Sequence, residues 1–219
     1  MGIFMKKISF GIGGLLMLSA MAVSDSFCVF AVYLFAALLH EMGHIIAAKT
    51  MKIGIKEIKF DFSGIRICTD SVITPYKSEI ILALSGPAVN LLAFLASALS
   101  WVIKYGSLED FFASANLLMK EGSGNADNVI AFFALSSLVQ ALINLMPVES
   151  FDGGRILYCA TAELSGDRAA RRVTDAASAL SAFLLWTVAL YLMLKISSGL
   201  GIYVFAACIF LSTLNKSQY

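Results

Sequence analysis

The sequence predicts an all-α polytopic membrane protein with about six transmembrane helices and one small amphipathic β-hairpin after the second helix. Of its 219 residues, 59% are hydrophobic and only 14% are charged, whereas about a quarter of the residues of a soluble domain are charged. The apolar residues gather into six long runs. Between the second and third runs, one segment instead alternates apolar and polar residues with a period of two.

Each apolar run predicts one transmembrane helix, because about 20 apolar residues cross the hydrocarbon core of a bilayer. The runs comprise residues 8–23, 27–48, 80–103, 129–147, 176–194 and 201–214. A cleaved signal peptide is the alternative for the first run, since Ala20-Met21-Ala22 resembles a cleavage site. We expect a single membrane-embedded domain over residues 1–219, with its core at about 27–160 and helices five and six at about 176–214.

Lysine and arginine in the connecting segments predict the orientation of these helices. With the N-terminus in the cytoplasm, all of the 16 basic residues except Lys104, Lys120 and Lys195 fall on the cytoplasmic side. We therefore expect a multi-pass protein of the cell membrane, in a prokaryotic plasma membrane, with both termini in the cytoplasm. The lipid bilayer is its expected surroundings, and the net charge of +1 gives no general attraction to nucleic acid.

Two connecting segments differ in character. Residues 53–68 read IGIKEIKFDFSGIRIC, with apolar and polar residues alternating on both sides of Ser63-Gly64. A period of two around such a turn dipeptide predicts a short amphipathic β-hairpin. The outer loop, residues 105–128, is acidic and contains Gly122-Ser123-Gly124, so we expect it to be flexible.

The second apolar run contains the sequence His40-Glu41-Met42-Gly43-His44. On a helix, this spacing puts both imidazoles on one face, where they can bind one Zn²⁺ ion, and Glu41 can take a proton from the metal-bound water. His40 and His44 are the only two histidines in the chain. Ionisable residues at this depth in a membrane are costly without a partner. A metal ion would supply that partner.

A catalytic zinc ion usually has three protein ligands and an open position for water. The chain has no third histidine, so a carboxylate or a cysteine is the expected third ligand. Asp152 is the best candidate, because it follows the fourth run at the depth predicted for the two histidines. Pro147 would end that helix, and Gly153-Gly154 would permit a tight turn toward the metal. Glu149 and Glu163 remain competitors.

Three motifs in this order resemble the site-2 protease family of intramembrane zinc metalloproteases. They are HEMGH, then Gly86-Pro87-Ala88-Val89-Asn90, then the set Asn144, Pro147, Asp152 and Gly153. The resemblance covers about residues 27–160 and is nearest to the compact, sporulation-type members, so we expect neither a PDZ nor a CBS domain. Asn90 is interpreted as structural, with Gly86 and Pro87 bending the third helix near the site.

The resemblance implies a role for each matched residue. His40, His44 and Asp152 would bind one catalytic Zn²⁺ ion. Glu41 would be the general base and later the proton donor to the leaving amine. Asn144 would bind substrate, by a hydrogen bond to its backbone or to the developing oxyanion. The predicted hairpin would pair with an extended substrate as an added strand.

The function so implied is that of an intramembrane zinc metalloendopeptidase. It would cleave single-span or membrane-associated regulatory proteins within the bilayer, near the cytoplasmic face. One alternative is another HExxH membrane protease, with Glu163 as third ligand, that cuts outside the bilayer. The other is a non-catalytic membrane scaffold or a metal transporter, although a transporter would distribute polar groups along a path across several helices.

Overall fold

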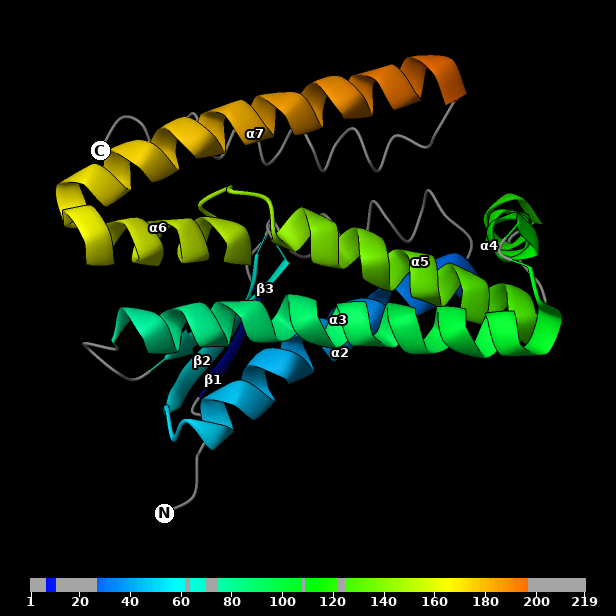
Figure 1. The fold of residues 1–219 in the computed structure, drawn as a ribbon, viewed down its shortest axis with the longest axis horizontal. Helices are drawn as coiled ribbons and strands as arrows, with labels where there is room; N and C mark the ends of the chain where they lie inside the picture. Colours follow the sequence, from blue (N-terminus) through cyan, green and yellow to red (C-terminus); the bar gives the residue numbers. More distant parts are fainter. Residues whose placement is uncertain are drawn as a thin grey trace.

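The computed structural model describes residues 7–10, 27–61, 64–69, 75–107, 109–121 and 125–196. This part of the chain holds three strands and six helices (Figure 1). In chain order they are β1 (Lys7–Phe10), α2 (Phe27–Thr50), β2 (Ile55–Asp61), β3 (Gly64–Thr69), α3 (Tyr76–Tyr105), α4 (Glu109–Glu121), α5 (Ala126–Asn144), α6 (Asp152–Ser165) and α7 (Asp167–Ile196).

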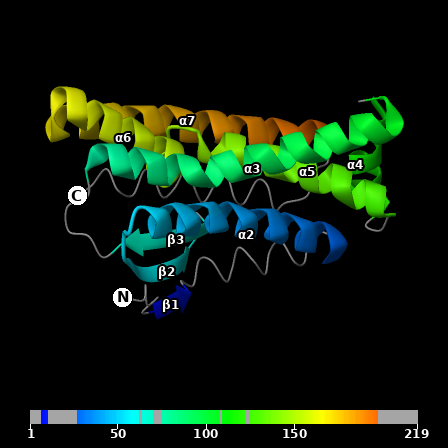
Figure 2. The same ribbon diagram turned by 60° about the horizontal axis from the view of Figure 1, so that its bottom comes forward.

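Helix α3 lies between the other long helices. It packs against α2 on one side and against α5 and α6 on the other, and α6 leads back into α7, which packs along α6. Figure 1 shows α5 and α6 following one another along α3, with α7 above them, and Figure 2 shows the strands beside the end of α2. As a result, α2 and α6 approach the same stretch of α3 from different sides.

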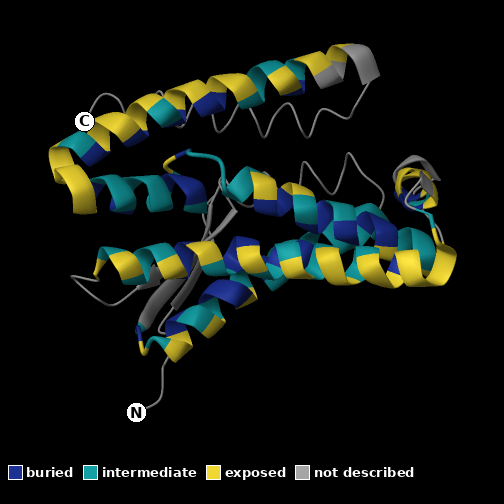
Figure 3. Cartoon of the chain, in the orientation of Figure 1, coloured by how far each residue is buried: buried dark blue, intermediate teal, exposed yellow. Residues whose placement is uncertain are grey.

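Four described helices are long and apolar enough to cross a membrane: α2, α3, α5 and residues 167–191 of α7. They coincide with the second to fifth apolar runs of the sequence. Exposed positions run along the outward faces of these helices (Figure 3). On α3 they include Leu92, Leu95 and Leu99. Such a surface suits contact with lipid, because the exposed side chains are apolar and a helix satisfies nearly all its backbone polar groups internally.

The expected fold class, all-α with about six spans and a β-hairpin, is wrong. Strands β2 and β3 do not stand alone, because β1 pairs in parallel with β2 to give a three-stranded sheet of order β1-β2-β3. Residues 8–10 were predicted as the start of the first helix, and they are extended instead. Four of the described helices qualify as spans, and α4 and α6 fall short of about 20 residues. Residues 11–23 of the first predicted span and the whole predicted span 201–214 lie outside the described residues.

The acidic segment 105–128, expected to be flexible, contains the helix α4. Its residues Phe111, Ala115 and Leu118 are buried at helical spacing and pack with Trp101 of α3 and Phe132 of α5. Figure 1 shows α4 almost end-on, lying across the end of α3 and α5. This helix is amphipathic and only 13 residues long, so a search for long apolar runs does not find it.

Helices α2 and α3 cross at very short range because glycine occupies the crossing point. A Cβ atom added to Gly43 would lie 2.5 Å from the carbonyl oxygen of Ser85 and 3.0 Å from a methyl group of Val89. Pro87 lies in the same part of α3 and has no N–H to give to the carbonyl of Ala83. This close crossing brings the histidine-bearing face of α2 directly against α3.

The Gly43→Ala variant should therefore be less stable. The added methyl group collides with backbone that cannot rotate away, and overpacking of this kind costs about 1–3 kcal/mol. Thermal unfolding of the purified protein in detergent measures the effect. The matched control is Ala31→Val, which adds methyl groups to an exposed position of the same helix. An unfolding temperature for Gly43→Ala as high as that of the control would contradict the proposed role of this contact.

Candidate metal centre

The second half of α2 carries His40 and His44 one helical turn apart. Both side chains are buried, with 4% and 7% of their surface exposed, and their rings meet edge to face with centroids 4.9 Å apart. The two Nε2 atoms lie 3.2 Å from each other. The expected placement of both imidazoles on one face of a helix is thus observed.

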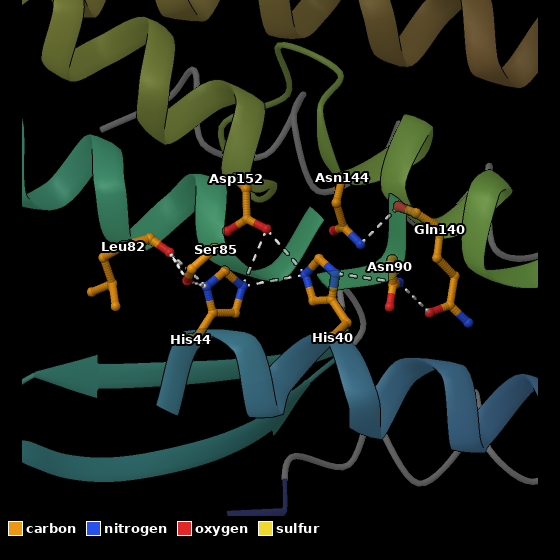
Figure 4. A network of polar contacts seen from close by, with 8 residues as sticks. All are labelled: His40, His44, Leu82, Ser85, Asn90, Gln140, Asn144 and Asp152. Atoms are coloured by element: carbon orange, nitrogen blue, oxygen red, sulfur yellow. Dashed lines mark hydrogen bonds and ion pairs between the residues drawn. The ribbon is translucent and has the colours of Figure 1, made fainter. Parts of the chain in front are cut away.

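Asp152 is the first residue of α6, and its carboxylate points at both rings (Figure 4). Its Oδ2 atom lies 3.1 Å from Nε2 of His40 and 3.3 Å from Nε2 of His44. Burial raises the pKa of the Asp152 carboxyl, but the contacts of its oxygen with the His40 and His44 rings outweigh burial, and its pKa lies below the ordinary value. The group is therefore a carboxylate, the form that a metal ion requires.

The glycines after Asp152 act differently from the expected tight turn. Gly153 and Gly154 have helical conformation within the first turn of α6, and neither has a positive φ. A Cβ atom at Gly153 would collide with the carbonyl of Leu145, and one at Gly154 with the carbonyl of Val148. These glycines let the start of α6 pack directly on the backbone that leaves α5, which fixes the position of Asp152.

Charged contacts also hold α6 against α3. Arg155, one turn after Asp152, forms an ion pair with Glu79 of α3. At the same end of the bundle, Asp167 accepts hydrogen bonds from the hydroxyl groups of Tyr76 at 2.8 Å and Tyr158 at 3.1 Å. These bonds join α3, α6 and α7 and keep the amino end of α6 facing α2.

The three ligand atoms form a nearly equilateral triangle with edges of 3.1, 3.2 and 3.3 Å. A tetrahedral zinc ion with bonds of about 2.0–2.1 Å separates neighbouring ligand atoms by about 3.3 Å. Among the described residues, His40, His44 and Asp152 are the group of this kind that could hold a metal ion. Two nitrogens and one carboxylate oxygen also match the donors that zinc prefers.

Gly86 of α3 provides space beside this triangle. A Cβ atom added there would collide with Nε2 of His44 and lie 2.7 Å from Nε2 of His40. Any other residue at this position would press on the two nitrogens that face Asp152. The space fits a metal ion because it is bounded by the donor atoms and left open by a missing side chain.

His44 is held by a backbone carbonyl of α3. Its Nδ1–H donates to the carbonyl oxygen of Leu82 at 2.7 Å, and the Ser85 hydroxyl donates to the same oxygen at 2.6 Å. A carbonyl can only accept, so the hydrogen of the neutral ring is on Nδ1 and the lone pair on Nε2. This is the arrangement that a metal-binding histidine needs.

His40 is held by amide side chains instead (Figure 4). Nδ2 of Asn90 lies 3.5 Å from Nδ1 of His40 and 3.3 Å from Oε1 of Gln140. Nε2 of Gln140 donates to the backbone carbonyl of Tyr33 at 3.0 Å. Asn90 was interpreted from the sequence as structural, and Gln140 was not singled out. The signal was present, because a polar residue inside an apolar run is a candidate for function.

Glu41 lies between the two histidines and is partly buried. Its Oε2 atom is buried without a hydrogen-bond partner. Burying an oxygen acceptor without a hydrogen bond costs free energy. An unpaired buried acceptor in a native structure therefore needs an explanation, and a functional role is one. The geometry leaves this oxygen available to a water molecule or a substrate group.

The remaining candidates are not part of the ligand triangle. Glu163 forms an ion pair with Lys77 at 3.7 Å and is 41% exposed, so it takes no part in the cluster. Glu149 is also outside the cluster, and its backbone N–H donates to the Ser178 hydroxyl at 2.8 Å. Nδ2 of Asn144 donates to the carbonyl of Gln140 at 3.1 Å.

Known proteins resemble this chain in sequence and in fold. The chain is 28% identical over 140 residues to a Synechocystis protein described as a candidate zinc metalloprotease. The match covers 63% of this chain and about a third (32%) of that relative. The fold is similar to that of the site-2 protease from Methanocaldococcus jannaschii, with a TM-score of 0.59, 18% identity, and coverage of 99% of this chain and 94% of the other.

The sequence model of one protein family matches most of the described part of the chain. It matches residues 28–188, a stretch that includes α2 from its second residue on, all the candidate ligands and about the first three quarters of α7. The resemblance stated over about residues 27–160 is therefore confirmed, and the match continues beyond it. The chain belongs to peptidase family M50, the site-2 protease family of membrane-embedded zinc metallopeptidases.

Proposed function

We propose that this protein is an intramembrane endopeptidase with one catalytic zinc ion at His40, His44 and Asp152. The observation that carries the proposal is the triangle of ligand atoms with edges of 3.1–3.3 Å inside a bundle of apolar helices. Beside it, Glu41 presents a buried carboxylate oxygen that has no partner. Two imidazoles, two carboxylates and an open space together suit the hydrolysis of a peptide bond.

The bound zinc would supply two effects, a lower pKa of water and polarisation of the scissile carbonyl. Glu41 accepts the proton of the attacking water and passes it to the leaving amine. His40, His44 and Asp152 would hold the ion as its three protein ligands, which leaves the fourth position of a catalytic zinc site for water. The apolar helices around them exclude bulk water, which strengthens each of these electrostatic interactions.

Asn144 is our candidate for binding the substrate. It lies on the last turn of α5, and Figure 4 shows it on the same side of the two imidazole rings as Asp152. Its amide carries both donors and an acceptor. A substrate backbone could therefore take the place of the Gln140 carbonyl as its partner, either in the ground state or as the oxyanion develops.

The substrates we propose are single-span or membrane-associated regulatory proteins. The ligands lie between apolar helices, so a substrate segment reaches them from the bilayer. The basic connecting segments favour an orientation with both termini in the cytoplasm, and cleavage would then occur near that face. A substrate helix must unfold locally to be cut, which favours helix-weakening residues near the cleavage site.

Glu41→Gln should keep the zinc and abolish cleavage. The amide has the shape of the carboxylate but cannot accept a proton, and loss of general-base catalysis costs about 10²–10⁴-fold in rate. Cleavage of a single-span test protein in proteoliposomes measures the rate, and atomic emission spectroscopy measures the zinc content. The control is Met42→Leu at an exposed neighbouring position. A fully active Gln variant would remove Glu41 from the mechanism.

Replacement of the two acidic candidates separately tests the third ligand. Asp152→Ala should lose bound zinc, because it deletes the oxygen that faces both imidazoles. Glu163→Ala should retain zinc, because this residue forms a surface ion pair with Lys77. Zinc per protein after gel filtration is the measurement. The opposite pattern would support the alternative protease with Glu163 as ligand.

Gly86→Ala should lose zinc without losing its fold. The new methyl group occupies the space beside the two Nε2 atoms, so the loss of affinity should exceed the roughly 10–100-fold effect typical of outer hydrogen-bond partners. Competition with a chromophoric chelator gives the affinity. The control is Ala88→Leu, which adds bulk at an exposed position of the same helix. Equal zinc affinity in the two variants would show that the open space is not the metal site.

A further inference from the structure

The two candidate histidine ligands are supported by different kinds of groups. Nδ1 of His44 faces the carbonyl of Leu82 at 2.7 Å, and a carbonyl always accepts. Nδ1 of His40 faces the side-chain amide of Asn90 at 3.5 Å, and an amide can turn either its oxygen or its nitrogen to a neighbour. The state of His40 therefore depends on which end of Asn90 it meets.

Asn90 is placed to serve the histidine cluster. It is fully buried, with 0% of its surface exposed, and it lies one helical turn after Gly86 on α3. Gly86 faces the Nε2 atoms of the two rings, and Asn90 faces the other side of the His40 ring. Neighbouring positions on one face of α3 thus surround the ligand from both sides.

A second amide holds Asn90 from behind. Gln140 of α5 accepts from Nδ2 of Asn90 at 3.3 Å and donates to the carbonyl of Tyr33 at 3.0 Å. Tyr33 and His40 are two turns apart on α2. The chain of contacts from His40 through Asn90 and Gln140 therefore returns to the helix on which it began, and it links α2, α3 and α5.

The two tautomers of His40 call for two different orientations of the Asn90 amide. As observed, Nδ2 points at Nδ1 of His40, which suits a ring whose hydrogen is on Nε2 and donates to Asp152 at 3.1 Å. Metal binding through Nε2 requires the hydrogen on Nδ1 instead, and Nδ1–H then needs an acceptor. The Oδ1 atom of Asn90 is such an acceptor, and it is buried without a partner.

On this basis we propose that Asn90 is a positioning residue for the metal ligand His40. With zinc bound, its amide turns so that Oδ1 accepts from Nδ1–H of His40 and keeps the lone pair of Nε2 directed at the ion. This turn gives up the hydrogen bond from Nδ2 of Asn90 to Oε1 of Gln140. The proposal rests on the metal centre proposed above, and it adds to that centre a residue that touches neither metal nor substrate.

Replacement of Asn90 by residues of similar size tests the acceptor role. Asn90→Leu offers no hydrogen-bonding group, and zinc affinity should fall about 10–100-fold. Asn90→Asp offers only acceptors and should restore most of that affinity. If Asn90 acts as a donor, or only fills space, Asp will be no better than Leu, and the proposal fails. Ser137→Ala is the control, because it removes another fully buried polar atom that has no partner.

Nuclear magnetic resonance of ¹⁵N-histidine-labelled protein gives a second readout that does not depend on activity. Two histidines give four ring nitrogens, and His44 serves as the internal reference. In the zinc-loaded wild type, the Nδ1–H of His40 should be protected from solvent exchange. Protection should be lost in Asn90→Leu, regained in Asn90→Asp, and unchanged at His44. Loss of both signals together would indicate general disruption and contradict a specific role.

Two further variants separate the possible failures. If Asn90→Leu does not fold, Asn90→Ala replaces it and is compared with Asn90→Asp in the same assays. His40→Ala tests the metal centre itself. If the wild type and His40→Ala bind zinc equally, the proposed centre is wrong. If only His40→Ala loses zinc and Asn90→Leu binds as the wild type does, the centre stands and the role of Asn90 is refuted.

Discussion

The close crossing of α2 and α3 is the constraint on which the rest of the site depends. Gly43 lets the backbones approach, and Gly86 leaves room where two imidazoles must point at one place. Asp152 comes from α6, which also packs against α3 and is fixed there by the ion pair of Arg155 with Glu79. If side chains held α2 and α3 further apart, the histidines of α2 would be separated from Asp152. His40 and Asp152 are 112 residues apart in sequence.

The site also shows how a polar cluster is tolerated between apolar helices. Most of its groups are paired inside the protein, as His44 is with Leu82 and Gln140 is with Tyr33. Two hydrogen-bond acceptors of the site are buried without a partner, Oε2 of Glu41 and Oδ1 of Asn90. Both belong to side chains beside the ligands. Unpaired groups at such positions are expected where a bound ion, water or substrate completes the set.

Local features of this protein were predictable from sequence, and long-range ones were not. The spacing of His40 and His44 is a property of one helix, and four apolar runs directly gave α2, α3, α5 and α7. Asp152 could be placed near the two histidines because its depth follows from where the fourth run ends. Strand β1 was missed because only its pairing with β2 makes it a strand. The clash that a Cβ at Gly153 would make is likewise visible only once α6 lies on Leu145.

The unequal support of the two histidines gives the site a fixed half and an adjustable half. The α3 backbone already holds His44 in the tautomer that can bind a metal through Nε2. Only His40 and its amide partners would therefore have to change when a metal binds. Gln140 stands one turn before Asn144 on α5, and Asn144 donates to the Gln140 carbonyl. The proposed substrate contact and the support of the proposed metal ligand thus share one turn of α5. If Asn144 binds substrate as proposed, drawing it away from Gln140 would act on the turn that carries the partner of Asn90. Substrate binding would then be coupled to the geometry of the metal centre.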